Sequence, residues 1–461
     1  MATSQEAGTE NLPLLLQTRS EHRHVFQTWF RSLEIVMALC FHTARFGGRL
    51  LWSKVSHKQR PWQALLGLCI AELCDTLGAT FIKIGQILST RCDLFPPELI
   101  EPLIMLQDRI KPFAFHHVSS MILTQYSSPL EEVFAEFEEQ PISSASIASV
   151  YRARLHDGSL VAVKIRRPDI ERKVRNDIRL MIFLARGIAR LPQMRLVPVV
   201  EMVNELGMAI EQQIDLRIEA RNNRRFRAQL TQDTQVLVPA LIDRYCTEAI
   251  LVMEFIDHLV RIDELDWTAA EYQESLVTGL RALYTMIFLD GFIHCDMHPG
   301  NFFLRRGGQV VILDTGFIAK LSDQDRRHFA RFFLGIATNA GRDCARILYE
   351  TASSKSDTFD REGFDLAVVD LINRFAGSKA ADFQVATFAF HIFDIQRRFG
   401  LRGSTNFTMA ILSLLIFEGI AKQLYPQLDF QSEARPFILR GMLLKRPEEV
   451  AFGAEDKPVK V

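Results

Sequence analysis

The sequence lacks the features of a secreted or disulfide-bonded protein. Its 7 cysteines are spread along 461 residues, and none stands in a CxxC pair or at zinc-ligand spacing from a histidine. We therefore expect reduced thiols in a cytoplasmic setting. The N-terminal segment MATSQEAGTENLPLLLQTRS has no apolar core of signal-peptide length, and it is not rich in arginine as a transit peptide would be.

A long uninterrupted apolar run is also missing. The nearest candidates are residues 33–41, which contain Glu34, and residues 410–417, which are too few, because a spanning helix needs roughly 20 apolar residues. We predict no transmembrane helix and a cytoplasmic location, with peripheral association at the inner face of a membrane.

An excess of one charge is absent too, since the formal net charge is -1. The totals therefore give no reason to expect a nucleic-acid partner. Hydrophobic residues make up 48% and charged residues 24%, which is typical of a globular protein. The length exceeds what one hydrophobic core usually supports, so two or three packed units are expected. The 34 phenylalanines hint at a lipid-facing surface.

The N-terminal part of the chain is patterned as helices. Within residues 25–56 apolar side chains recur at helical spacing: Phe26, Trp29, Phe30, Leu33, Val36, Met37 and Cys40. The basic residues around this stripe are Arg31, Arg45, Arg49 and Lys54. Such a helix lies either in a membrane interface or against its own domain, and both alternatives remain open. Further helices are expected from Trp62 to about Arg91 and from Pro97 onward, so the chain is predicted to be helical up to about Phe137.

The pattern changes near Ile142. SIASVYRARL alternates apolar and polar residues, HDGS supplies a turn, and LVAVKI resumes a β-rich run, which together predict a β-hairpin. Residues 201–230 are patterned as a helix, and LVPAL and AILVMEF as strands. Helices dominate from about Ala269, interrupted by the segments FIHCDMHPGNFFL and QVVILDTGF.

The most informative segment is the loop HCDMHPGN, which begins at His294. The spacing of Asp296 and Asn301 matches the kinase catalytic-loop pattern H-x-D-x-x-x-x-N, and Asp314 follows at the end of a strand-like run. Phosphoryl transfer needs one carboxylate near the acceptor, and further oxygen ligands that hold Mg²⁺ against the phosphates. We predict that Asp296 orients or deprotonates the acceptor and that Asn301 and Asp314 bind metal. For the loop taken alone, a polar turn capped by Asp and Asn is the alternative.

Two residues upstream complete the expected catalytic set. Lys164 ends the run VAVK, where a kinase places the lysine that pairs with the α- and β-phosphates, and Glu219 on the following helix is its expected partner. The segment that begins with Glu254 is either the hinge that contacts adenine or a plain strand end.

The loop that covers the phosphates should precede Lys164 by one hairpin. Small residues stand there, with Ala145, Ser146 and Ile147 at the centre, and none is glycine. Small side chains let backbone N–H groups approach phosphate, but the lack of glycine makes the loop stiffer.

The segment FIKIGQILSTR, residues 81–91, resembles the KxGQ hallmark of the UbiB-like family, the aarF-domain-containing (ADCK-type) atypical kinases. The HxDxHPGN form of the catalytic loop and the small-residue loop are also similar to that family, and the resemblance extends from about residue 65 to Gly419. It implies an α+β, protein-kinase-like two-lobed fold with an N-terminal helical (KxGQ) extension across the active site. Lys83 and Gln86 would then reach toward the nucleotide; without the resemblance they would be the polar face of a helix.

The predicted organisation follows from these boundaries. A loose N-terminus spans 1–24, the helical extension 25–137, the N-lobe 138–257, the mainly helical C-lobe 258–453 and a loose tail 454–461.

The resemblance implies an atypical kinase or ATPase that uses ATP and Mg²⁺ and supports ubiquinone or related prenyl-lipid biosynthesis at a membrane surface. Expected partners are prenyl-lipid or quinone intermediates and other quinone-biosynthesis proteins. The alternative is a nucleotide-gated scaffold or lipid chaperone with little phosphotransfer. An ordinary Ser/Thr protein kinase is disfavoured, because no segment ending in APE follows Asp314 and the extension would obstruct a peptide substrate.

Three positions depart from the family pattern. Gln213 stands two residues before Asp215, where a glutamate is usual, so its contact with the KxGQ segment is expected to be weaker or shared with Glu211. Ser149 replaces a common glutamine, and a contact there is expected to be lost. Thr315 replaces the aromatic residue of the kinase DFG motif.

Overall fold

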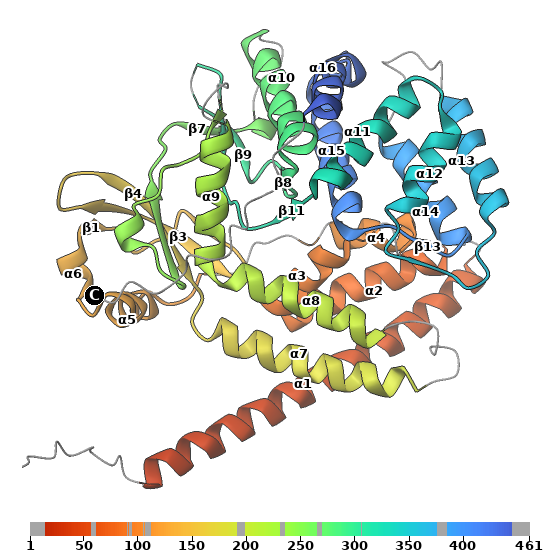
Figure 1. Ribbon diagram of the computed structural model, residues 1–461. Coiled ribbons are helices and arrows are strands. Elements are labelled where there is room, and N and C mark those ends of the chain that lie inside the picture. Colours follow the sequence, from red (N-terminus) through yellow and green to blue (C-terminus); the bar gives the residue numbers. More distant parts are fainter. Residues whose placement is uncertain are drawn as a thin grey trace, which may run out of the picture.

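The computed structural model describes residues 14–56, 61–89, 91, 95–104, 106, 112–190, 199–230, 236–264, 270–305, 307–375 and 385–444. Of residues 14–29 it describes only the backbone, and the predicted tail 454–461 lies outside the described residues. Strands gather in one lobe and helices in the other, and the N-terminal helices run along the lower side of both (Figure 1). The predicted α+β, two-lobed fold with a helical extension is confirmed.

Four helices open the extension: α1 (Leu14–Val55), α2 (Trp62–Leu77), α3 (Ala79–Ser89) and α4 (Pro97–Ile104). The expectation of a loose segment through residue 24 is wrong for residues 14–24, because this stretch contains neither glycine nor proline and continues the helix. α2 and α3 are separated at Gly78, whose φ of 82° is a left-handed conformation that glycine adopts without strain.

The apolar stripe of α1 faces away from the rest of the protein. Every member of the predicted stripe whose side chain is described is exposed, whereas Phe26 and Trp29 lie outside the described side chains. Further along the helix the exposed apolar residues are Phe41, Leu51, Trp52 and Val55. The opposite face, with Ile35 and Ala38, packs in a hydrophobic cluster with α2, α3 and α7 (Ile170–Ile188). For the described residues, the alternative that the stripe is domain core is therefore wrong.

The basic residues around this stripe mostly bind the protein itself. Nε of Arg31 donates to Oδ1 of Asp177 on α7 over 2.9 Å. Both Nη atoms of Arg49 donate to the carboxylate of Glu72 on α2, over 2.9 and 2.8 Å, and Arg45 lies 3.3 Å from the same carboxylate. These pairs fasten α1 to the protein.

The N-lobe is a five-stranded sheet in the order β1-β3-β4-β6, with β2 paired to β3. Its strands are β1 (Phe134–Phe137), β2 (Ser143–Ser144), β3 (Ala148–Leu155), β4 (Leu160–Arg166) and β6 (Ile250–Glu254). The predicted hairpin is confirmed as β3–β4. The expectation of helix up to Phe137 is wrong for β1, because this segment pairs with β3 and the Phe134 ring enters the core beneath the sheet. The helices α5 (Phe115–Tyr126) and α6 (Leu130–Val133) also contribute to that core.

Three helices connect β4 with β6: α7, α8 (Val199–Ile214) and α9 (Leu216–Leu230). The sequence predicts one helix over 201–230, but the chain breaks at Asp215. Its carboxylate accepts the backbone N–H of Arg217 over 3.0 Å, which caps the first turn of α9. The break lets α9 stand beside the sheet while α8 runs across to the extension (Figure 1).

The C-lobe combines small sheets with helices. One sheet has the order β5-β10-β9-β7, and two-stranded sheets pair β8 with β11 and β12 with β13. The strands are β5 (Val236–Leu237), β7 (Leu259–Arg261), β8 (Phe292–His294), β9 (Phe302–Arg305), β10 (Gln309–Ile312), β11 (Ile318–Lys320), β12 (Ser354–Lys355) and β13 (Leu401–Arg402). The helices are α10 (Ala270–Tyr284), α11 (Asp323–Ala337), α12 (Gly341–Glu350), α13 (Arg361–Phe375), α14 (Val385–Arg398), α15 (Thr405–Leu424) and α16 (Phe430–Leu443).

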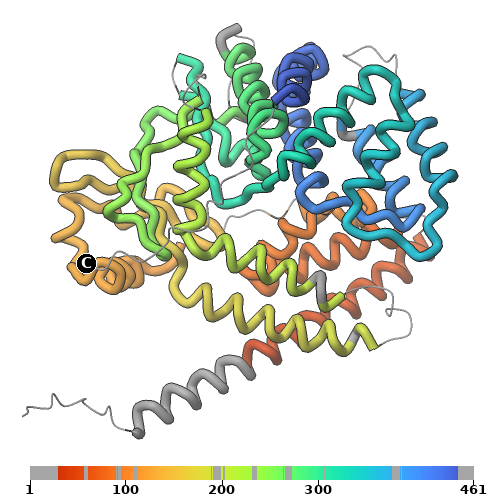
Figure 2. The backbone as a smooth tube through the Cα atoms, viewed as in Figure 1, coloured from red at the N-terminus to blue at the C-terminus, as the bar shows by residue number. Residues whose placement is uncertain are grey.

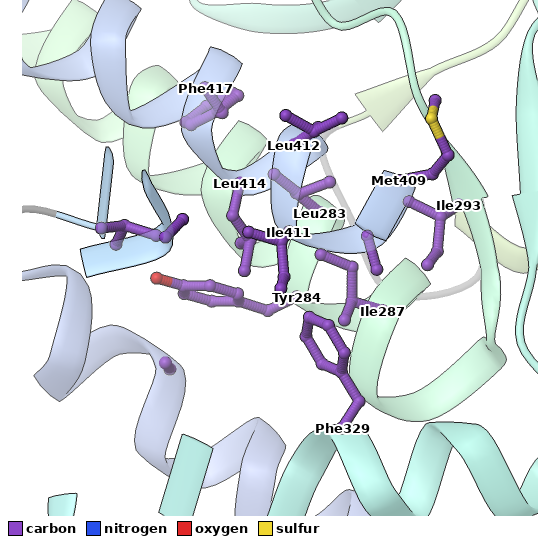
Figure 3. Packing of buried hydrophobic residues seen from close by; sticks show 14 of the residues in the cluster. Leu283, Tyr284, Ile287, Ile293, Phe329, Met409, Ile411, Leu412, Leu414 and Phe417 are labelled. Atoms are coloured by element: carbon purple, nitrogen blue, oxygen red, sulfur yellow. The ribbon is translucent and has the colours of Figure 1, made fainter. Parts of the chain in front are cut away.

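Within the described part of the chain, α15 alone is long and apolar enough to cross a bilayer. However, 61% of its most apolar window is buried in the protein. Figure 3 shows Ile411 and Leu414 of this helix beside Leu283 of α10 and near Phe329 of α11. The length and apolarity of α15 therefore fit a core helix of the C-lobe.

The extension contacts both lobes. Glu205 of α8 lies 3.6 Å from Arg91, which follows α3, and 3.5 Å from Arg402 of the C-lobe. Arg397 donates to the carbonyl of Phe95 over 3.3 Å. Figure 2 shows the orange helices of the extension next to the blue helices of the C-lobe. The extension is thus held against both lobes.

Candidate active site

The N-lobe sheet and α9 bring Lys164 and Glu219 together. Side chains alternate along β4, so Val163 and Ile165 are buried under the sheet and Lys164 leaves the opposite face. Its Nζ donates to both carboxylate oxygens of Glu219 over 2.8 Å. Only 12% of the lysine side chain and 6% of the glutamate side chain are exposed. The predicted pairing of these two residues is present.

Asp314 reaches the same lysine from the C-lobe. It follows β10 and adopts a φ of 47°, a left-handed conformation that aspartate tolerates better than most residues. Nζ of Lys164 donates to its Oδ2 over 3.0 Å, and the backbone N–H of Gly316 donates to its Oδ1 over 3.0 Å. Lys164 therefore bridges a carboxylate of the N-lobe and one of the C-lobe.

The protonation of this cluster is shifted by its surroundings. Burial acts to lower the pKa of Lys164, but the carboxylates of Asp314 and Glu219 outweigh it and raise that pKa above its ordinary value. Burial raises the pKa of Glu219 to about 7, against the pull of Lys164. Partial burial also acts to raise the pKa of Asp314, but the charge of Lys164 holds it well below its usual range. The Lys164 ammonium thus faces two carboxylates, of which Glu219 is protonated more easily than an ordinary glutamate because it is buried.

A buried histidine joins Asp314 to the predicted catalytic loop. The backbone N–H of Asp296 donates to Nδ1 of His294 over 3.1 Å, and Nε2 lies 2.7 Å from the carbonyl oxygen of Asp314. Because Nδ1 accepts, the proton of the neutral ring must be on Nε2, which donates to Asp314. Burial lowers the pKa of His294 and so favours this neutral form. One imidazole therefore connects the two carboxylate-bearing segments.

Asn301 lies against Asp296 within the loop. Its Nδ2 donates to the Asp296 carbonyl over 3.0 Å and toward Oδ2 over 3.3 Å, and it lies 3.3 Å from Nε2 of His298. Because these contacts engage the amide nitrogen of Asn301, its amide oxygen points away from Asp296 and can serve as a metal ligand.

The donor set fits a cation that binds together with phosphates. In the described part of the chain, no three His, Cys, Asp or Glu side chains are close enough to hold a metal ion by themselves. Mg²⁺ in nucleotide sites is commonly held by one or two carboxylates together with substrate phosphates. Asn301 and Asp314 supply oxygen ligands of this kind, and Lys164 is placed to contact phosphate.

The two KxGQ residues behave differently. The positive charge of Lys83 is close enough to act on Glu219 and Asp314, where it favours the ionised carboxylates. Its predicted reach toward the nucleotide stays a prediction. Gln86 instead donates its Nε2 to the carbonyl of Leu106 over 3.4 Å. No hydrogen bond between Gln86 and a predicted site residue occurs among the described residues.

The small-residue loop is a tight turn between β2 and β3. Ala145 donates its backbone N–H to the carbonyl of Ala148 over 2.9 Å, with Ser146 and Ile147 at the tip. The hydroxyl of Ser149 lies 2.9 Å from that of Ser144, so Ser149 supports the turn from within.

The predicted hinge residue Glu254 ends β6 and lies next to the connection to the C-lobe. Its backbone N–H donates to the carbonyl of Ala240 over 2.8 Å, and its carboxylate faces the Ala240 N–H over 3.4 Å. A contact with adenine at this residue would therefore fall to its backbone carbonyl.

Of the other two departures, Thr315 has a structural counterpart, whereas the predicted contact of Gln213 with the KxGQ segment stays a prediction. The carboxylate of Asp215 is bound by the guanidinium of Arg217 over 2.9 Å. The Thr315 hydroxyl donates to the carbonyl of Glu219 over 3.1 Å, and Asn222 donates to the carbonyl of Thr315 over 3.0 Å. Thr315 thus ties the Asp314 segment to α9. Sequence reasoning missed Asn222, although its position one helical turn after Glu219 places both on one face.

Comparisons with known proteins agree with this geometry. Residues 105–348 match the ABC1 atypical kinase-like domain, and residues 368–429 match the UbiB helical domain. The "Probable protein kinase UbiB" of Sodalis glossinidius (strain morsitans) is 33% identical over 434 residues, which cover 90% of this chain and 78% of that protein. The protein of the same name from Vibrio cholerae serotype O1 (strain M66-2) is 32% identical over 401 residues, covering 85% and 73%.

Among solved structures, the complex of Rv3197 with erythromycin from Mycobacterium tuberculosis is similar with a TM-score of 0.43 and 21% identity, over 74% of this chain and 91% of that one. The two domain matches and the relatives together confirm the resemblance read from the KxGQ and HxDxHPGN motifs. The chain belongs to the UbiB family of ABC1 atypical kinase-like proteins.

Proposed function

We propose that this chain is an ATP- and Mg²⁺-dependent kinase-like enzyme that hydrolyses ATP or transfers its terminal phosphoryl group. One observation carries the proposal: Lys164 bridges Glu219 and Asp314 across the two lobes, and His294 connects Asp314 to Asp296. Residues from four distant segments thus converge in the arrangement that phosphoryl transfer requires.

Each residue has a role that follows from its position. Bound ATP with Mg²⁺ supplies the phosphoryl group and the charge neutralisation. Lys164, fixed by Glu219, orients the phosphates, and Asp314 and Asn301 hold the cation. Asp296 accepts the proton of the attacking hydroxyl or water. His294 fixes the position of Asp296 relative to Asp314 through its two hydrogen bonds.

The biosynthetic role is inferred from the family. We assign the chain to ubiquinone or related prenyl-lipid biosynthesis, with prenyl-lipid or quinone intermediates as the molecules it serves and other proteins of that pathway as partners. Deletion of the gene followed by quinone profiling tests this assignment. A normal quinone profile in the deletion strain would refute it.

The membrane part of the proposal rests on α1 and α7. α1 exposes its apolar stripe, with Phe41 62% and Trp52 72% exposed. α7, which is joined to α1 by the Arg31–Asp177 pair, exposes one face with the residues Arg172, Arg175, Arg179, Phe183 and Arg186. Exposed apolar and basic helix faces together suit an anionic bilayer surface.

Co-flotation with phosphatidylglycerol-containing vesicles tests this attachment. The double change Phe41→Glu and Trp52→Glu should release the protein, whereas Leu366→Glu, at an equally exposed apolar residue on α13, should not. Arg179→Gln should weaken flotation with anionic vesicles only, because it removes charge without apolar area. Unchanged flotation of the double variant would exclude α1 as the membrane surface.

The enzymatic part is tested by Asp314→Asn. We expect this variant to lose Mg²⁺-dependent ATP turnover and to keep its fold by circular dichroism. Asp343→Asn, at an exposed carboxylate on α12, is the matched control and should behave as the wild type. Unchanged turnover in Asp314→Asn would remove the mechanism.

A nucleotide-gated scaffold or lipid chaperone is the second candidate function. The observation that favours it is the glycine-free turn at Ser146, which is braced by the Ser144–Ser149 contact and thus suits slow or conditional chemistry. Hydrolysis that is stimulated by vesicles but yields no phosphorylated product would favour this candidate over phosphotransfer.

A further inference from the structure

A single arginine outside the predicted site holds the turn that should meet the phosphates. Arg167 follows β4 directly, three residues beyond Lys164. Its Nε donates to the carbonyl of Ala145 over 2.8 Å, and its Nη2 donates to the hydroxyl of Ser144 over 2.9 Å. Its backbone N–H donates to the carbonyl of Ile147 over 2.8 Å.

Two further contacts restrict this arginine. Its guanidinium lies over the ring of Phe113, 5.6 Å from the centroid, which favours one orientation of the fork. The Ser144 hydroxyl that it binds is also 2.9 Å from that of Ser149. The turn is therefore tied through both its backbone and its side chains.

The peptide geometry gives these contacts a direction. All described peptide bonds are trans, so the C=O and N–H of one peptide unit point to opposite sides. Because Arg167 draws the Ala145 carbonyl toward itself, the N–H of Ser146 in the same unit points away from Arg167. A turn held in this way has little conformational freedom, as a loop that binds phosphate requires.

We propose that Arg167 is a positioning residue that fixes the turn from Ser144 to Ile147 in the shape that receives the nucleotide phosphates. The inference rests on the proposed function. Arg167 acts through the turn, since its Nε and Nη2 atoms are engaged by the protein. Removing its planar fork should weaken nucleotide binding more than it slows the chemical step, because the groups at Asp296 and Asp314 stay in place.

Binding of ATP with Mg²⁺ to the full chain, together with kcat and KM for hydrolysis, tests the proposal. Arg167→Met and Arg167→Lys should both raise Kd and KM roughly tenfold, as expected for the loss of about one charged hydrogen bond, with kcat changed much less. Lysine cannot reproduce two donors in a fork. If Arg167 instead contacted phosphate directly through its charge, Arg167→Lys would bind nearly as well as the wild type, and the proposal would be overturned.

Two further variants separate the role of Arg167 from general effects of substitution. Ser144→Ala removes the hydroxyl that contacts both Arg167 and Ser149 but leaves the contact of Arg167 with the Ala145 carbonyl. It should therefore have a smaller effect that is only partly additive with that of Arg167→Met. Arg166→Met is the matched control, since Arg166 contacts the carbonyl of Ile214 and Glu171 instead of the turn. Hydrogen exchange of the amides 144–148 should be faster in Arg167→Met than in Arg166→Met, and equal exchange would contradict the inference. If the wild type fails to bind ATP, the proposed function falls with this inference; if it binds and the variants bind equally, only the role of Arg167 is refuted.

Discussion

Replacement of Glu219 by glutamine probes the contact that joins the two lobes. The change keeps the size of the side chain but removes its charge and one of the two acceptors at 2.8 Å from Nζ of Lys164. The amide NH₂ of glutamine would face the Lys164 ammonium. Both groups are hydrogen-bond donors, so this contact would become unfavourable. Lys164 would then keep Asp314 as its carboxylate partner at 3.0 Å.

The loss of stability in Glu219→Gln depends on how deeply the contact is buried. Lys164 and Glu219 are 12% and 6% exposed, so solvent compensates little for a lost partner. Breaking a buried ion pair costs about 3–5 kcal/mol, but here Asp314 still neutralises the lysine and glutamine keeps one acceptor. Because burial already raises the pKa of Glu219 to about 7, the neutral glutamine also relieves part of the desolvation cost. We therefore expect the free energy of unfolding to fall by about 1.5 kcal/mol, at the lower end of the range for one charged hydrogen bond.

The variant should also bind ATP with Mg²⁺ more weakly, because a lysine drawn to Asp314 competes with the cation for that carboxylate. Urea unfolding and equilibrium nucleotide binding measure the two effects. Glu248→Gln is the control, since Glu248 is 46% exposed and lies 3.6 Å from Arg217, a contact worth less than about 1 kcal/mol. A Glu219→Gln protein as stable as this control, with unchanged nucleotide affinity, would refute the reasoning.

Two further predictions concern the metal site and the docking of α1. A Cβ added at Gly316 would lie 3.0 Å from Oδ1 of Asp314, so Gly316→Ala should raise the Mg²⁺ concentration needed for hydrolysis. Gly187→Ala is the control, because a Cβ there meets open space. Equal Mg²⁺ requirements of the two variants would contradict Asp314 as a metal ligand. The hydrogen bonds from Arg49 lower the pKa of Glu72 below its ordinary value of 4.5. A carboxyl group with a lowered pKa stabilises the folded protein at pH values above 4.5, and this stabilisation is lost as the pH falls and the group is protonated. Glu72→Gln should therefore reduce the free energy of unfolding by about 1 kcal/mol at pH 7 and by progressively less below pH 4.5, and a difference independent of pH would count against this pairing.

Several parts of the fold were predictable because they depend on neighbours in the chain. The alternation before and after the Asp-Gly turn predicted β3 and β4, and the turn closes as Asp157 accepts the N–H of Ser159 over 2.9 Å. The order of Lys164, Glu219 and Asp314 predicted a shared site, since that order is characteristic of kinases. In each case the decisive information lies in short spacings.

The features that the sequence did not predict depend on contacts between distant parts of the chain or on where a helix is docked. The predicted helix over 201–230 breaks where the Asp215 carboxylate caps α9. The sequence also did not indicate that Arg31 and Arg49, beside the α1 stripe, are bound by carboxylates of α7 and α2. Such partners lie far away in sequence or depend on where a helix is docked.

By itself, the sequence determined the secondary-structure periodicity, the identity of the reactive side chains and the family, because these depend on residue type and local spacing. Only the tertiary structure decided that Lys164 joins two lobes and that His294 links Asp296 to Asp314. It also decided that Arg167 binds the turn at Ala145 and that α1 exposes its apolar face. A hydrogen bond requires two groups within about 3 Å, and for residues far apart in sequence that distance is set by how the helices and sheets pack together.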